Sequence, residues 1–317
     1  MFDLSKFSFR NRAYLNLILV AAIWGIASPV IKFTFNGIDP LPFLAYRFLI
    51  AGTISLIFFA RKIRRGKKFR QLRANFWAAS LYGILAVPVA LGILFFGLEK
   101  STVLDLTLVG TIGPLIVTAG GALIFHDKIT KKEKLGISIV IVGLVINTFF
   151  PLFQAGEAVK FSGNILLVLY LFSDSGSILL AKYIIRNKVK SSNLTNLAFL
   201  MGAITLAPIA IYKYGFFGFV DTIISLPLKY HLGVWYMAVL SGNLAYLLYV
   251  KSQKSIEVSE ASLFMYLQPL FTIPLAVFWL DEKLTLPFVV GAVIIAIGIY
   301  IAEKKTKKPV NHSQLPK

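Results

Sequence analysis

The chain has 317 residues, of which 57% are hydrophobic and 15% are charged, and its formal charge is +19. Soluble globular domains are about 45–50% apolar and about 25% charged, so the composition excludes an ordinary soluble enzyme and a disordered basic tail. Cysteine is absent, which excludes a disulfide framework, a cysteine-ligated metal site and thiol catalysis. The position of the positive charge then distinguishes a nucleic-acid partner from a membrane topology.

Apolar segments long enough to cross a bilayer follow one another along the chain. Such a helix needs about 20 mainly apolar residues, and the short connections make neighbouring helices antiparallel. We expect the first segment to be a membrane helix rather than a cleaved secretory signal, because it exceeds a signal's apolar region. The fifth, seventh and tenth segments are short and need flanking polar residues or local bilayer thinning. The ten predicted spans are Tyr14–Phe35, Pro40–Ala60, Asn75–Leu98, Thr102–Phe125, Leu135–Phe150, Phe161–Ala181, Leu194–Tyr212, Leu232–Val250, Val258–Leu280 and Leu286–Ala302.

Basic residues are distributed unevenly between the two sets of loops. Loops on the side of the N-terminus hold 26 of the 33 Lys and Arg residues, and the opposite loops hold 5. This asymmetry predicts a multi-pass protein of the cell membrane with both termini in the cytoplasm. The basic run 61–73 fits a cytoplasmic flank that touches anionic headgroups. We therefore expect the lipid bilayer, and no nucleic acid, as the partner of the positive charge.

The second half of the chain repeats the first at an offset of 155 residues. Each copy contains five spans, an odd number, so the second copy has inverted topology, which is common in alternating-access carriers. We predict an all-α integral membrane protein with ten transmembrane helices in two inverted five-helix repeats. The expected parts are a cytoplasmic tail (1–13), the two repeats (14–150 and 161–303) and a basic cytoplasmic tail (304–317). The matched pairs include Val103/Val258, Leu108/Leu263, Pro114/Pro269, Leu115/Leu270, Lys128/Lys283, Thr130/Thr285, Gly136/Gly291 and Gly143/Gly298.

Motifs in both copies are similar to those of a known family. They are Trp24-Gly25, Pro40, Arg47, Ser101-Thr102, Gly113-Pro114, Lys128-Ile129-Thr130, Gly136 and Gly143 in the first copy, and Ser259, Gln268-Pro269, Asp281–Thr285, Gly291 and Gly298 in the second. Over about residues 14–303 the chain resembles EamA-type permeases of the drug/metabolite transporter superfamily. The resemblance implies export of amino acids or other small metabolites. The family's usual Leu-Gly-Glu is Phe125-His126-Asp127 and Leu280-Asp281-Glu282 here, so its glycine is missing from both copies.

Asp174 lies near the middle of the sixth predicted span, where a charge is costly unless it is sheltered, and is therefore a functional candidate. Tyr170, Asp174 and Ser177 fall on one helix face, which suits the wall of a water-filled cavity. We expect Asp174 to bind a substrate amine or to act as a titrating proton site. Pairing with a lysine of another helix for assembly is the alternative.

Trp24, Ser28 and Lys32 share one face of the first span. Pro29 frees a backbone carbonyl beside them, so this face is a candidate lining of a substrate path. Trp24 could stack on the solute, although packing is the more common role of an aromatic residue on an apolar helix. Arg47, about 10 Å inside the second span, is another intramembrane cation. For both Lys32 and Arg47 the alternative is a long side chain that extends to the interface.

The fourth and ninth spans have matching polar faces, which we expect to line the central path. Pro29, Pro114 and Pro269 are expected to kink their helices, since each removes a helical hydrogen bond. Asp105 and Glu260 lie near helix starts, where interaction with the helix dipole is more plausible than gating. The remaining candidates are Thr107, Thr111, Asn243, Tyr246, Ser262, Tyr266 and Gln268 for the path, and Gly136, Gly143, Gly291 and Gly298 for helix packing.

These features favour a secondary transporter that exports a small organic solute by alternating access. No P-loop motif is present, so ATP drive is not expected. No clustered metal ligands are visible, so no metal is expected, and we expect no cofactor. Coupling to protons, exchange or uncoupled facilitation stay open. One alternative is a non-transporting membrane scaffold or regulatory protein. The other is an integral-membrane enzyme, although His126, His231 and His312 form no recognisable catalytic constellation. The sequence does not define the substrate or the oligomeric state.

Overall fold

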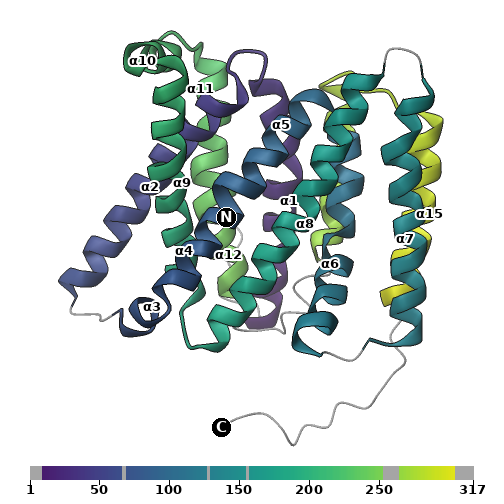
Figure 1. The fold of residues 1–317 in the computed structure, drawn as a ribbon, viewed down its shortest axis with the longest axis horizontal. Coiled ribbons are helices and arrows are strands. Elements are labelled where there is room, and N and C mark those ends of the chain that lie inside the picture. The colour runs from purple at the N-terminus through teal and green to yellow at the C-terminus, as the bar shows by residue number, and fades with distance from the viewer. Residues whose placement is uncertain (1–8, 66–68, 127–128, 155–156, 253–263, 304–317) are drawn as a thin grey trace, which may run out of the picture.

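The computed structural model describes residues 9–65, 69–126, 129–154, 157–252 and 264–303. This part of the chain is a bundle of helices without strands (Figure 1). Nine of its helices are long and apolar enough to span a membrane, and a shorter apolar helix, Phe264–Phe278, is the tenth. The predicted all-helical fold of ten transmembrane helices is confirmed. The uninterrupted long helices are α1 (Phe9–Thr34), α2 (Pro40–Arg64), α6 (Val103–Phe125), α7 (Lys131–Phe149), α8 (Ala158–Arg186), α9 (Ser191–Tyr214) and α15 (Leu286–Glu303).

The third and eighth spans, which occupy equivalent places in the two repeats, are interrupted helices. The third consists of α4 (Phe76–Ile84), the π-helical segment η2 (Leu85–Leu91) and α5 (Gly92–Lys100), and the eighth of α11 (Leu228–Trp235), the π-helical segment η4 (Tyr236–Leu244) and α12 (Ala245–Ser252). Pro88 lies inside η2. In η4 the Asn243 amide donates to the Ala238 carbonyl at 2.8 Å. The apolar pattern predicted two regular helices here, and it carries no signal for π-helical turns, which often accompany functional sites.

The ninth span has a 3₁₀ turn, η5 (Phe264–Leu267), followed by α14 (Gln268–Phe278). The first residues of the predicted span, including Glu260 and Ser262, lie outside the described residues. Pro269 occupies the first turn of α14, where a missing N–H costs no helical hydrogen bond, so the expected kink within the helix at Pro269 is wrong. The proline inside α14 is Pro274, whereas Pro29 and Pro114 lie inside α1 and α6 as expected.

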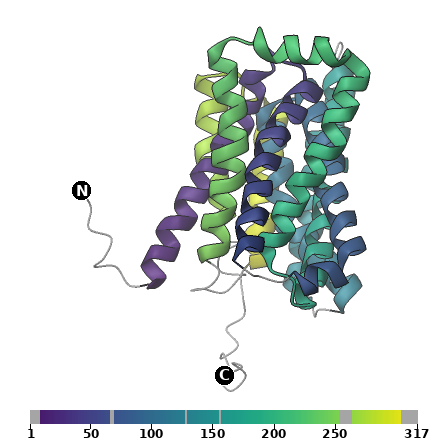
Figure 2. The ribbon, with the colours of Figure 1, turned by 90° about the vertical axis from the view of Figure 1, so that its left-hand side faces the viewer.

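Short helices occupy two segments that the sequence suggested were loops. The helix α3 covers Arg70–Ala74, and α10 covers Phe216–Ile224. Figure 2 shows α10 lying across the end of the bundle where α1 terminates, and it packs on α9 and α2. Phe217 of α10 is 84% exposed, which suits an aromatic side chain at a membrane–water interface.

One equivalent residue in each of the two hairpins that carry the repeat motif has a left-handed backbone conformation. His126 and Asp281, equivalent at the 155-residue offset, both adopt the left-handed region, with φ of 58° and 55°. Glycine reaches this region without a steric penalty, whereas residues with a Cβ do not. Each hairpin then ends on a threonine at the start of the next helix. Thr130 forms a capping box at α7, and Thr285 accepts from the Phe288 N–H at α15.

The helices α7 and α15 pack against each other through the repeated glycines. An added Cβ on Gly136 would lie 2.4 Å from the Gly298 carbonyl oxygen, and one on Gly143 would lie 3.0 Å from the Gly291 carbonyl oxygen. Neither contact leaves room for a side chain, because the approaching group is backbone. The glycine spacing therefore sets a close approach of the last helices of the two repeats.

Replacing His126 by glycine should stabilise the protein. The left-handed conformation costs an L-residue about 1–2 kcal/mol, and glycine avoids this cost but loses about 0.5–1 kcal/mol more backbone entropy on folding. We expect a net gain of up to about 1 kcal/mol, seen as a higher thermal midpoint of the detergent-solubilised protein. His126→Ala keeps the Cβ and is the matched control, for which no gain is expected. An equal gain in both variants would contradict the steric explanation.

Candidate functional site

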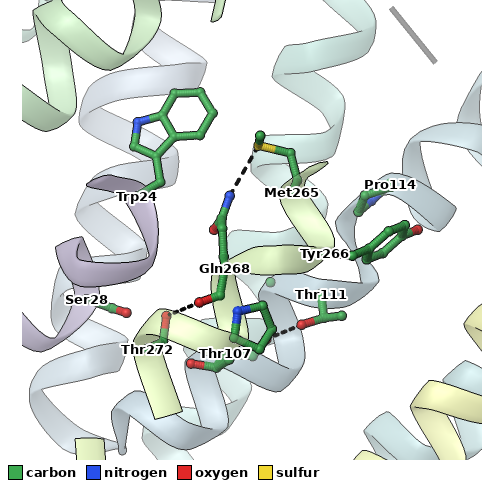
Figure 3. Close-up of a pocket in the computed structure, with 11 residues that line it drawn as sticks. Trp24, Ser28, Thr107, Thr111, Pro114, Met265, Tyr266, Gln268 and Thr272 are labelled. Atoms are coloured by element: carbon green, nitrogen blue, oxygen red, sulfur yellow. Dashed lines mark hydrogen bonds between the residues drawn. The ribbon is translucent and has the colours of Figure 1, made fainter. Parts of the chain in front are cut away.

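A pocket with a volume of about 80 Å³ lies between α1, α6 and the η5–α14 segment (Figure 3). Both repeats contribute to it, since α1 and α6 belong to the first and α14 to the second. Figure 3 shows the Gln268 side chain between Trp24 of α1 and Thr111 of α6. The lining residues are Trp24, Ser28, Thr107, Gly110, Thr111, Pro114, Met265, Tyr266, Gln268, Pro269 and Thr272.

The pocket brings together residues that are equivalent in the inverted repeat. Thr111 and Pro114 of the first copy correspond to Tyr266 and Pro269 of the second, and all four line it. The equivalent of Thr107, Ser262, lies outside the described residues. The pocket therefore lies where the two inverted copies meet, the position that substrates occupy in carriers built from such repeats.

A proline and a glycine determine how α1 meets α14 beside the pocket. Pro29 has no N–H, so the Gly25 carbonyl four residues earlier lacks its helical donor. The Thr272 hydroxyl of α14 donates to that carbonyl at 2.6 Å. A Cβ on Gly25 would lie 2.7 Å from the Gln268 carbonyl oxygen, so only glycine allows this approach. The proline-containing helix of the first repeat is thus joined to the second repeat by a bond to the carbonyl that Pro29 leaves without its helical donor.

On the opposite wall of the pocket, a proline of α6 also leaves a carbonyl without its helical donor, but no neighbouring hydroxyl replaces it. Pro114 leaves the Gly110 carbonyl without its helical donor. The neighbouring hydroxyls bond elsewhere, because Thr111 donates to the Thr107 carbonyl at 2.6 Å and Thr118 to the Pro114 carbonyl at 2.9 Å. Gly110 lines the pocket, and a Cβ added to it would meet no atom within 4 Å. Pro114 thus makes the Gly110 carbonyl a candidate acceptor for a donor group of a solute.

Trp24 connects this pocket to the other polar residues of the bundle. Its indole N–H donates to the Ser241 carbonyl of η4 at 3.0 Å, which fixes the orientation of the ring. The ring centre lies 5.2 Å from that of Tyr246 in α12. On the pocket side, the Gln268 amide contacts the Met265 sulfur at 3.3 Å, a weak hydrogen bond that a solute can replace.

Asp174 lies in the middle of α8 and is half-buried. Within the described residues its carboxylate has no hydrogen bond and no ion pair; the Ser177 hydroxyl donates to its backbone carbonyl at 2.8 Å instead. The carboxylate acts electrostatically on Tyr170 of its own helix and on Tyr246 of α12. It also acts on Tyr82 of α4, which the sequence analysis did not single out. The lysine partner required by the alternative, assembly role of Asp174 is not found among the described residues.

Other predicted path residues have polar groups that bond within the fold. The Lys32 amine donates to the backbone carbonyls of Leu98, Glu99 and Ser101 at 2.8, 3.1 and 2.7 Å, and so closes the C-terminal end of α5. The Tyr266 hydroxyl bonds to Glu303 at 3.2 Å. Lys32 lies outside the pocket, and Tyr266 contributes to the pocket while its hydroxyl is bonded to α15.

Asp105 belongs to a polar cluster at the N-terminal end of α6. Its carboxylate accepts from the Asn147 amide at 2.9 Å and lies 3.5 Å from the Lys160 amine. The Thr102 hydroxyl caps the helix at the Asp105 N–H at 3.0 Å. These contacts match the interaction of an acidic residue with a helix start, and they leave Asp105 outside the pocket.

Glu282 joins the hairpin of the second repeat to α6 of the first. Its carboxylate accepts from the backbone N–H groups of Val103 and Leu104 at 2.7 and 3.0 Å. An anion is favoured at a helix N-terminus, where free N–H groups and the helix dipole converge. Burial raises the pKa of the Glu282 carboxyl above its ordinary value, and the two N–H donors and Lys32 oppose this shift.

The sequence analysis missed three of the pocket residues, Gly110, Met265 and Thr272. Gly110 and Thr272 have a sequence signal in retrospect. Gly110 is four residues before Pro114, and Thr272 is four residues after Gln268 on the same helix face. Met265 has no such signal, because it enters the pocket from the 3₁₀ turn η5.

The model of the EamA-like transporter family matches residues 11–149 and again residues 161–303. The chain belongs to the EamA-like transporter family. It is a multi-pass membrane transporter, and its two family matches coincide with the two helical repeats described above.

Two relatives and one solved structure illustrate this membership. An uncharacterised transporter of Bacillus subtilis, YyaM, is 25% identical over 93% of this chain and 95% of its own length. A probable amino-acid metabolite efflux pump of Salmonella typhimurium is 24% identical over 90% and 92%. A crystal structure superimposes with a TM-score of 0.58 at 16% identity, over 93% of this chain and 97% of that one, which supports the fold.

Thr272→Val should destabilise the protein, because it leaves the Gly25 carbonyl without either of its donors. Loss of a partner for a buried polar group costs about 1–3 kcal/mol, which should lower the thermal midpoint of the detergent-solubilised protein. Thr118→Val is the matched control, since the Thr118 hydroxyl is exposed and bonds within its own helix. Equal midpoints for both variants would show that the bond between α1 and α14 is unimportant.

Proposed function

We propose that this transporter exports a small organic solute, an amino acid or a related metabolite, by alternating access. The observation that carries the proposal is the pocket between α1, α6 and α14, where Thr111 and Pro114 meet their inverted equivalents. In this mechanism the two repeats rock around a solute held between them, and the pocket opens to one side of the membrane at a time.

The chemistry of the pocket supports a small polar solute. Its volume of about 80 Å³ is well below the roughly 300–1,000 Å³ of drug-sized sites. Trp24 offers an aromatic face, Thr107 a hydroxyl and Gln268 an amide that both donates and accepts. The name of the Salmonella relative, an amino-acid metabolite efflux pump, is consistent with the same substrate class and direction.

Asp174 is proposed as the group that binds a substrate amine or carries a coupling proton. It is connected to the pocket through Tyr246, on which it acts electrostatically and whose ring packs against Trp24. An acid near the middle of a spanning helix, without a partner in the part of the chain that the structure describes, suits either role. Exchange and uncoupled facilitation are the alternatives to proton coupling.

We further propose that the protein resides in the cell membrane with both termini in the cytoplasm, on the strength of the loop charges. Because the chain has no cysteine, single cysteines report the orientation directly. In intact cells Asp221→Cys in α10 should react with a membrane-impermeant maleimide, and Lys190→Cys before α9 should react only after permeabilisation. The reverse pattern would invert the topology.

Purified protein in liposomes should move at least one amino acid or related metabolite from a labelled pool, down its gradient or by counterflow. Trp24→Ala and Gln268→Ala should each lower that flux by at least about tenfold, the effect of losing about 1.4 kcal/mol of solute binding. Thr118→Val, outside the pocket, should retain it. Absence of flux for every solute tested would favour a scaffold or regulatory role.

Asp174→Asn separates the two proposed roles of the acid. If Asp174 carries the coupling proton, the variant should lose the pH dependence of flux while still exchanging solute. If Asp174 binds the amine, the apparent affinity for the solute should fall at every pH. Unchanged affinity together with an unchanged pH profile would remove Asp174 from the mechanism.

A further inference from the structure

Arg47 is a buried cation whose donors lack acceptors. It lies in α2, and its side chain is only 6% exposed. The Nε and Nη1 atoms have no hydrogen-bond partner, and no carboxylate among the described residues forms an ion pair with it. Arginine stays protonated in proteins, so the fold holds a charge for which this part of the chain supplies no counter-ion.

The surroundings of Arg47 are aromatic. The guanidinium lies 5.0 Å from the ring centre of Phe48 and 6.0 Å from that of Phe95. These rings attract the charge, but they offer no acceptor in the direction of the N–H groups. The polar group that acts on Arg47 electrostatically is the hydroxyl of Tyr246. A neutral side chain could pack among these rings without desolvating a charge, so packing alone does not account for an arginine here.

Arg47 is connected to the pocket through Tyr246. The Tyr246 ring lies 5.2 Å from that of Trp24, which lines the pocket, and the same tyrosine interacts electrostatically with Asp174. Tyr246 is 38% exposed, although it comes from a helix that packs on α1 and α9. A cation and an anion that both lack a charged partner among the described residues thus interact electrostatically with the same tyrosine.

We propose that Arg47 binds the carboxylate of the transported solute, and that Tyr246 positions this group relative to Asp174. The planar guanidinium presents N–H donors in the geometry that a carboxylate accepts, and the unpartnered Nε and Nη1 supply such donors. The proposal rests on the proposed transport function. It adds a requirement that the function alone does not make, namely that the solute carries an anionic group.

The test compares an amino acid with the amine obtained by removing its carboxyl group. Wild-type protein in liposomes should move the amino acid at least about tenfold faster than the amine, because a buried charge pair contributes strongly when formed. Arg47→Gln should lower amino-acid flux by at least about tenfold and leave amine flux unchanged, so that the preference disappears. Arg47→Lys should retain part of it. Lys229→Gln removes an exposed cation that lies over a tyrosine ring and should leave the preference intact.

A binding measurement keeps the proposal testable without transport. The amino acid, but not the amine, chloride or inorganic phosphate, should raise the thermal midpoint of solubilised wild-type protein, and Arg47→Gln should abolish this effect. Without solute, Arg47→Gln should be at least as stable as wild type, because it removes an unpaired buried charge.

Other results would overturn the carboxylate site. They are an equal loss of amino-acid and amine flux in Arg47→Gln, a preference that survives in it, a lower midpoint without solute, or stabilisation of wild type by chloride or phosphate. If wild type moves no solute at all, the proposed function fails, and the binding measurement still decides whether Arg47 recognises a carboxylate.

Discussion

The structure depends on one constraint: hydrocarbon cannot hydrogen-bond to a polar group, so the protein, water or a ligand must do so. Most intramembrane polar groups meet this constraint within the fold. The Gly25 carbonyl that Pro29 releases receives the Thr272 hydroxyl, and the Asn243 amide donates to a carbonyl of the π-helical segment η4. Lys32 donates to three carbonyls at the end of α5. Such residues are structural because their bonds are already made.

Three polar groups that lack such bonds among the described residues are connected with Trp24 or Tyr246. The Gly110 carbonyl, in the pocket wall, lacks its helical donor because of Pro114, and Arg47 and Asp174 have no charged partner among the described residues. Each would be costly if the bundle were only a scaffold. They are connected to a pocket formed by both repeats. A solute or water that enters this pocket can supply the missing bonds.

The inverted repeat explains why the two halves meet at that pocket. The equivalent residues His126 and Asp281 both adopt the left-handed region before α7 and α15, which pack through paired glycines. Glu282 of the second hairpin binds the N-terminus of α6 in the first repeat and so joins the two copies. Its equivalent in the first hairpin, Asp127, lies outside the described residues.

Features that follow from residue patterns along the chain, such as apolar runs and regular spacing, could be predicted from the sequence. Apolar runs predicted the ten-helix fold, and four-residue spacing predicted that Trp24 and Ser28 share a face, as do Thr107 and Thr111; all four line the pocket. Features that depend on a distant partner could not be predicted. The use of Lys32 as a cap for α5 depends on contacts between residues 66 to 69 positions apart, and no local pattern encodes them.

The central claim is alternating access to a pocket shared by the two repeats. Its most direct test is to determine from which side of the membrane position 111 is accessible. In the cysteine-free chain, Thr111→Cys in proteoliposomes should react with a membrane-impermeant maleimide added on either side. The transported solute should slow both reactions. Thr118→Cys, exposed on the same helix outside the pocket, should show no protection by solute. Reaction of Thr111→Cys from only one side, or from neither, would contradict the mechanism.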